Sequence, residues 1–119
     1  MILQIHDNLL VSDIKERFSN SFPCFKIEFY DMPHHNKKEN LEKYRINSEK
    51  RIGEIRNNRN EGFLEIKSWY TVKQIEKNFS ELFGLNIQIF KKENGRWIRN
   101  LNRDRLSLQQ QSTDLCSAN

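Results

Sequence analysis

Few side chains in this sequence have the types and spacing that metal binding requires. His6, His34 and His35, together with Cys24 and Cys116, are the only soft ligands for a transition metal. Adjacent histidines rarely converge on one ion, because zinc sites space their ligands by two or more residues. We therefore expect no metal site and no cofactor.

Catalytic groups are equally sparse. Asp7 and Asp31 each follow a predicted strand, so they are candidates for a carboxylate pair in acid–base catalysis. Aspartates at strand ends are more commonly turn residues. The four glycines are not spaced as in a phosphate-binding loop, and hydrolase and kinase motifs are absent. The sequence predicts a binding protein rather than an enzyme.

A stronger indication of function comes from cations interleaved with aromatic rings toward the C-terminal end. Asn94-Gly95 predicts a hairpin with a two-residue type I′ turn. Strand alternation then places Phe90, Lys92, Trp97 and Arg99 on one face. Exposed rings can stack on bases while cations neutralise phosphates, and each stacked base contributes about 1 to 3 kcal/mol. The candidate binding residues are Phe90, Lys91, Lys92, Arg96, Trp97, Arg99, Arg103 and Arg105.

Three interpretations of this face stay open. It can be a protein interface, where Trp and Arg are enriched. It can bind nucleic acid, although the aromatic motif of RNA-binding ferredoxin-like domains is missing. The rings can also be buried under residues 41–55 as a second small core. Phe63, Lys67 and Trp69 would enlarge the face if their strand points the same way. We expect a protein partner or self-association, with nucleic acid as the alternative.

An internal repeat predicts the elements that position these residues. Residues 3–22 match residues 64–83 at seven of twenty positions, and six of the seven matches are apolar. The matched pairs are Leu3/Leu64, Ile5/Ile66, Val11/Val72, Ile14/Ile75, Phe18/Phe79, Ser19/Ser80 and Phe22/Phe83. After a one-residue gap, Phe25, Ile27 and Phe29 correspond to Leu85, Ile87 and Ile89. Each half is therefore predicted to form a strand, a helix and a second strand.

Local signals mark the ends of both helices. Thr71 stands three residues before Gln74, as in a capping box, and Gly84 follows the last apolar position of that helix. In the first half, Ser12 or Asp13 is the expected cap. Pro23 is the expected stop.

These elements predict an α+β fold. Two βαβ units can form one four-stranded sheet with both helices on one face, as in a ferredoxin-like sandwich, and the C-terminal hairpin adds a strand. A β-grasp-like strand order is the main competitor. We expect a single domain over residues 1–106, with halves 3–31 and 64–101. The charged connector 32–62 is expected to hold one or two short helices broken by Gly53, and the polar tail 107–119 is expected to be disordered.

Length and charge agree with a small soluble protein. The chain has 119 residues, of which 36% are hydrophobic and 30% charged, enough for one core. Residues 37–59 and 91–105 each carry a net charge of +4, whereas the remainder sums to −4. There is no apolar run of membrane-spanning length and no export signal, so we expect a cytoplasmic protein with no membrane contact and reduced cysteines.

Three stretches of the second half carry a resemblance to known proteins: Gly84-Leu85-Asn86-Ile87-Gln88-Ile89-Phe90-Lys91-Lys92, Gly95-Arg96-Trp97-Ile98 and Leu106-Ser107-Leu108-Gln109-Gln110-Gln111. They resemble a family of small uncharacterised bacterial proteins with a GLNVQVFRKSG-like strand and turn, then W-L, then a TD-W-T-L-x-Q-Q-N-like end. Arg51 to Arg56, the Glu61-Gly62 turn and the Thr71-Val72 helix start are similar too, so the resemblance covers roughly residues 50–111. Residues 102–105 depart from it, where the family has Thr-Asp and Trp. The resemblance implies a shared fold and no particular activity.

Overall fold

The structure, a computed structural model, describes residues 1–31, 42–99 and 103–112 of the chain. The chain contains both helices and antiparallel strands, which gives an α+β architecture. The elements in chain order are β1 (Ile2–Ile5), α1 (Val11–Ser21), β2 (Phe25–Phe29), the 3₁₀ turn η1 (Glu42–Tyr44), α2 (Ile52–Ile55), β3 (Gly62–Glu65), α3 (Val72–Phe83), β4 (Ile87–Glu93), β5 (Arg96–Ile98) and α4 (Leu108–Gln111).

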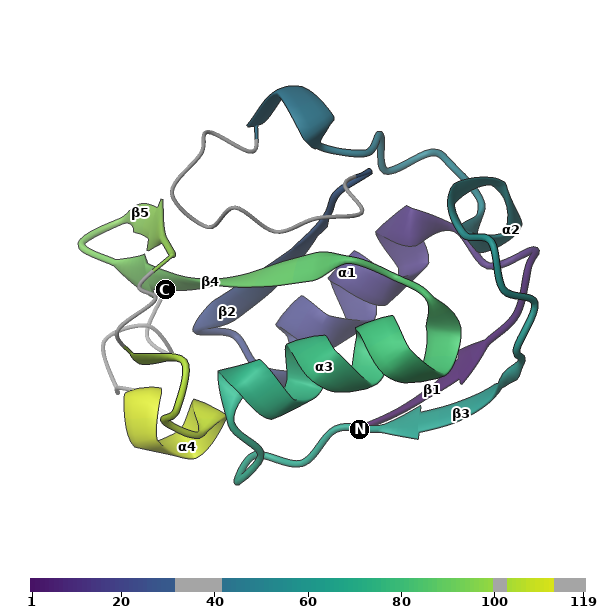
Figure 1. The fold of residues 1–119 in the computed structure, drawn as a ribbon. Coiled ribbons are helices and arrows are strands. Elements are labelled where there is room, and N and C mark those ends of the chain that lie inside the picture. Colours follow the sequence, from purple (N-terminus) through teal and green to yellow (C-terminus); the bar gives the residue numbers. More distant parts are fainter. Residues whose placement is uncertain (32–41, 100–102, 113–119) are drawn as a thin grey trace.

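The described strands form two antiparallel sheets (Figure 1). One has the order β1-β3 and the other has the order β2-β4-β5. The sequence predicted one four-stranded sheet, so the ferredoxin-like arrangement is not confirmed. The reason is that alternating apolar residues determine which side chains face the core, whereas they do not determine which strand edges pair.

The pairing registers bring related positions of the two halves opposite each other. In the first sheet, Leu3 lies opposite Leu64. In the second sheet, Glu28 lies opposite Gln88. Strands from different halves of the chain therefore pair in both sheets.

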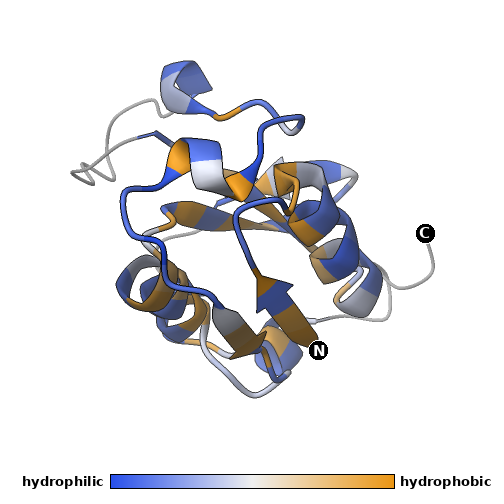
Figure 2. Cartoon of the chain, turned by 90° about the vertical axis from the view of Figure 1, so that its right-hand side faces the viewer, coloured by the Kyte–Doolittle hydropathy of each residue, from blue (hydrophilic) through white to orange (hydrophobic). Residues whose placement is uncertain are grey.

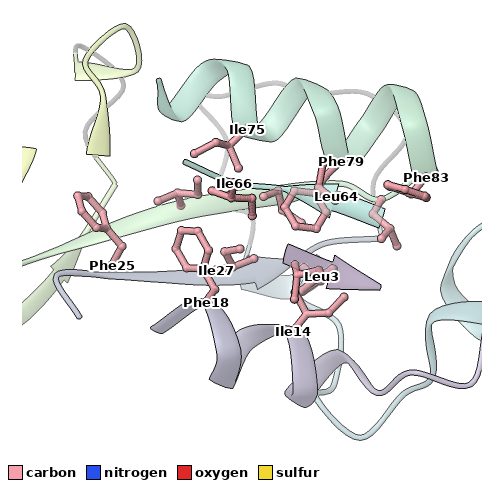
Figure 3. Packing of buried hydrophobic residues seen from close by; sticks show 14 of the residues in the cluster. Leu3, Ile14, Phe18, Phe25, Ile27, Leu64, Ile66, Ile75, Phe79 and Phe83 are labelled. Atoms are coloured by element: carbon pink, nitrogen blue, oxygen red, sulfur yellow. The ribbon is translucent and has the colours of Figure 1, made fainter. Parts of the chain in front are cut away.

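A single cluster of buried apolar side chains joins the two sheets to the two long helices. In Figure 3, Ile75, Phe79 and Phe83 of α3 approach this core from one side and Ile14 and Phe18 of α1 approach it from the other. The helices show hydrophobic and hydrophilic colours along their length in Figure 2, as expected where one stripe is buried. The ring of Phe79 packs edge-on against Phe29 with 6.3 Å between ring centroids.

The expected helix and turn signals of the second half are confirmed. The Thr71 hydroxyl accepts a hydrogen bond from the Gln74 N–H at 3.1 Å. Gly84 ends α3 in the left-handed conformation with φ of 66°. Asn94 and Gly95 have φ of 51° and 76°, the positive values that a type I′ turn needs.

Three local features differ from expectation. Helix α1 starts two or three residues earlier than the expected caps Ser12 and Asp13, because the Asp13 carboxylate accepts from the Leu10 N–H at 3.0 Å and makes Leu10 the cap. Gly53 lies inside α2, because the Glu54 carboxylate accepts from the Arg51 N–H and Ile52 is fully buried. Cys24 is disulfide-bonded rather than reduced, and Cys116 lies outside the described residues.

The polar end of the chain begins as an ordered helix. Ser107 caps α4, and the Gln110 side chain returns a hydrogen bond to the Ser107 N–H at 2.8 Å. Leu108 is fully buried in the core. The sequence predicted disorder from residue 107, but one apolar residue among glutamines is enough to anchor this turn. Within the part of the chain that the structure describes, no helix is long and apolar enough to cross a membrane.

Candidate interaction surfaces

The β4–β5 hairpin places the predicted aromatic residues on the outward side of the larger sheet. Lys92 lies opposite Trp97 in the expected register. Ile87 and Ile89 face the core, so Phe90 and Lys92 point the other way. The Trp97 side chain is 40% exposed, which excludes its burial under residues 41–55. Phe90 is half-buried.

Lys26 completes this group, although sequence reasoning missed it. It lies in β2 directly opposite Phe90. Its ammonium is 5.3 Å from the centroid of the Phe90 ring and 5.3 Å from that of the Trp97 ring, a cation–π arrangement with both. The alternation of Phe25-Lys26-Ile27 indicated that Lys26 faces outward, but only the pairing of β2 with β4 brings it to the rings. We call Lys26, Phe90, Lys92 and Trp97 the basic aromatic surface.

A buried carboxylate lies next to this surface. Glu28 is 4% exposed and forms ion pairs with Lys15, with Lys26 at 3.7 Å and with Arg45 at 3.4 Å. Burial, followed by the Glu28 and Glu42 carboxylates, raises the pKa of nearby Tyr30 to about 12. Three cations surround one carboxylate, so Glu28 does not make this side of the molecule negative.

The other predicted binding residues are dispersed. Lys91 and Arg103 both contact the Glu93 carboxylate, at 3.5 and 2.9 Å, so their charges are partly neutralised. Arg99 follows β5 and is half-buried. Arg105 lies elsewhere, in a depression with Lys73 and Lys77 of α3. The structure therefore keeps Phe90, Lys92 and Trp97 of the predicted set on one face of the hairpin. It places Arg96 opposite Glu93 on the other face and separates Arg105 from all of them.

A second surface lies on the outer face of the β1–β3 sheet. Leu3, Ile5 and Leu64 are buried, whereas the alternate residues point outward. Ile2 is 51% exposed and Phe63 is 69% exposed. Because β3 and β4 lie in different sheets, Phe63 does not extend the basic aromatic surface. We call Ile2, Phe63 and Trp69 the apolar surface.

Trp69 borders an open groove next to this sheet. The groove has a volume of about 790 Å³ and is lined by Ile2, Arg17, Glu65, Lys67 and Trp69, among others. Trp69 is 60% exposed, and the Lys67 ammonium lies 4.9 Å from its ring centroid. Lys67 also contacts the Glu65 carboxylate at 2.7 Å; this hydrogen bond lowers the pKa of Glu65 and raises that of Lys67.

The candidate catalytic and metal-binding residues do not come together. Asp7 forms an ion pair with Arg56 at 2.9 Å, and Asp31 follows β2 in the other sheet. No group of three or more His, Cys, Asp or Glu side chains suited to a metal occurs among residues 1–31, 42–99 and 103–112. His34 and His35 lie outside the described residues. Comparisons of the chain with protein families, with curated proteins and with solved structures gave no match.

Proposed function

We propose that this chain is a protein-interaction module whose apolar surface docks a second copy of the same chain. The observation that supports this most is the exposure of Ile2, Phe63 and Trp69, each more than half exposed on or beside one two-stranded sheet. Large apolar side chains gathered in this way commonly mark protein interfaces.

Charge favours a second copy at this surface. Around it lie the acidic residues Glu61 and Glu65 and the basic residues Arg17 and Lys67, which are exposed or half-buried. A twofold-symmetric contact requires a surface that complements itself, and a balance of both signs allows this. The basic aromatic surface, by contrast, would repel a second copy of itself.

The backbone of β3 offers a matching edge. Met1 and Ile66 exchange hydrogen bonds of 2.8 Å, so by alternation the N–H and C=O groups of Phe63 and Glu65 point away from β1. These groups have no backbone partner within the described residues. An antiparallel strand from a second copy would satisfy them.

The charges select one register for that pairing. With Leu64 on the twofold axis, Phe63 pairs with Glu65 of the second copy, and Glu61 lies opposite its Lys67. With Phe63 on the axis, Glu61 would face Glu65, which is unfavourable. We therefore propose the first register, which joins two β1–β3 sheets into one four-stranded sheet.

Sedimentation velocity over a range of protein concentrations tests this proposal. We expect a reversible dimer with a dissociation constant in the micromolar range, because the contact is small. Phe63→Glu should give a monomer, whereas Leu82→Glu should not, since Leu82 is 48% exposed on α3. Glu61→Lys and Lys67→Glu should each weaken the dimer, and the double variant should recover most of the affinity. A wild-type chain that stays monomeric throughout would refute the proposal.

Two further inferences remain proposals. We infer that the chain is a duplicated βαβ unit, which is supported by the matched residues Leu3 and Leu64 lying opposite each other in the β1–β3 sheet. A cytoplasmic location also stays a prediction. The disulfide at Cys24 argues against it, since cytosolic thiols are mostly reduced.

A further inference from the structure

We infer that the basic aromatic surface binds single-stranded nucleic acid, independently of the proposed self-association. The two surfaces lie on different sheets. The inference goes beyond a protein-interaction role, because it assigns a second partner of different chemistry to the β2–β4–β5 sheet.

The position of Lys26 is the first step of the argument. Its ammonium is 5.3 Å from the ring centroids of both Phe90 and Trp97, and it also forms a 3.7 Å ion pair with Glu28. A cation held against two rings keeps both the positive charge and the aromatic planes at the same place on the surface. A base can then stack on the exposed part of Trp97 while its phosphate approaches the cations.

The pattern of ion pairs is the second step. Glu93 is shared by Lys91 and Arg103, and Glu28 is buried among three cations. Within the described residues, Lys92 forms no ion pair. The carboxylates near this surface are therefore already neutralised, and the Lys92 ammonium, directly opposite Trp97, is available for an anionic partner.

The shape of the surface favours a single strand over a duplex. Strand β5 has three residues, all exposed, and Trp97 in its centre is the ring open to solvent. Bases of a single strand can unstack and lie on such a ring, whereas those of a duplex are already stacked within the helix. An acidic peptide would satisfy the cations but would leave the stacking surface unused.

The test uses fluorescein-labelled oligothymidylate and oligouridylate of about 12 nucleotides and a DNA duplex of equal length, a span typical of one single-strand site. We expect single strands to bind more tightly than the duplex at low salt. The fluorescence of each tryptophan can be measured separately by replacing the other one. In the Trp69→Phe variant only Trp97 fluoresces, and we expect the oligonucleotide to quench it. In the Trp97→Phe variant only Trp69 fluoresces, and we expect no quenching.

Salt dependence separates stacking from phosphate contacts. Replacing Lys92 with Gln should reduce the slope of log K against log salt by about 0.7, the contribution of one phosphate contact on a single strand. Trp97→Ala should lower affinity by about 10-fold with little change in slope, because stacking releases few ions. The control variant replaces Lys73 and Lys77, which are exposed on α3, with Gln and should leave the slope unchanged.

Several results would overturn the inference. One is the absence of binding at tens of micromolar protein in low salt, and another is an affinity for the duplex equal to that for the single strands. A third is a loss of salt slope in the α3 control variant as large as that in the Lys92 variant, which would indicate nonspecific attraction to the whole basic chain. Repeating the titration with Phe63→Glu keeps the two proposals distinct. Nucleic-acid binding should survive this substitution even though self-association should not.

Discussion

Arg56 is expected to be the most important charged residue for stability. Its side chain is fully buried, and it donates to the Asp7 carboxylate at 2.9 Å. It also donates to the carbonyl oxygens of Asn60 at 2.5 Å and Phe83 at 3.3 Å. One guanidinium thus links the end of β1, the loop before β3 and the end of α3. Arg56→Met keeps most of the volume and removes all of these hydrogen bonds.

The expected cost follows from burial. Breaking a buried ion pair by removing one partner typically costs about 3 to 5 kcal/mol, because the remaining group loses its compensation. Asp7 is about one-third exposed, so water partly replaces Arg56 around its carboxylate. The two carbonyl groups lose a charged donor, and hydrogen bonds to charged groups contribute about 1.5 to 3 kcal/mol each. We therefore expect Arg56→Met to lower the free energy of unfolding by about 3 kcal/mol.

Arg59 provides a matched control because it contacts the same carboxylate from the surface. Its side chain is 87% exposed and lies 3.4 Å from Asp7. Exposed pairs contribute about 0 to 1 kcal/mol, so Arg59→Met should change stability little. Urea unfolding followed by circular dichroism measures both variants. Equal destabilisation by the two substitutions, or an Arg56→Met midpoint equal to wild type, would refute the argument from burial.

The remaining predictions concern the core and pH. Phe79→Ala and Phe18→Ala should each lower the free energy of unfolding by about 3 to 5 kcal/mol, because both rings are fully buried and their removal leaves a cavity; an unchanged urea midpoint in either variant would contradict their packing. Because the pKa of Tyr30 is raised to about 12, the folded state holds this proton more tightly than the unfolded state, whose tyrosine pKa is about 10. This contribution to stability, about 2 to 3 kcal/mol, is present below pH 10 and is lost as the pH rises toward 12. Tyr30→Phe should reduce this loss of stability at high pH. A spectrophotometric titration of the wild-type protein at 295 nm should show one tyrosine ionising near pH 12. Complete ionisation of all three tyrosines by about pH 10.5 would contradict the prediction.

Local structure could be predicted where the cause is local. The Thr71 cap, the left-handed Gly84 and the Asn94-Gly95 turn depend on residues within one turn of each other, and the structure confirms all three. The hairpin register follows from the turn, so the pairing of Lys92 with Trp97 could be predicted as well. These signals are strong because neighbouring residues alone determine them.

Strand pairing between distant segments could not be predicted in the same way. The apolar alternation of β1, β2, β3 and β4 is compatible with any arrangement that buries the same side chains. Placing α1 and α3 on opposite sides of the core buries both helix stripes between two small sheets (Figure 3). A single sheet would bury one stripe of each helix equally well. Burial alone therefore does not distinguish the two arrangements from the sequence.

The candidate surfaces show why charge along the sequence differs from charge on the surface. Residues 91–105 have a net charge of +4. However, Lys91 and Arg103 both form ion pairs with Glu93, and Arg105 lies beside α3. Lys26 belongs to a part of the chain with net negative charge, yet the pairing of β2 with β4 places it against Phe90 and Trp97. The surface that we propose attracts an anion therefore combines cations of two segments, Lys26 and Lys92. It follows that the β2–β4 register, which no local signal encodes, decides where such a partner would bind.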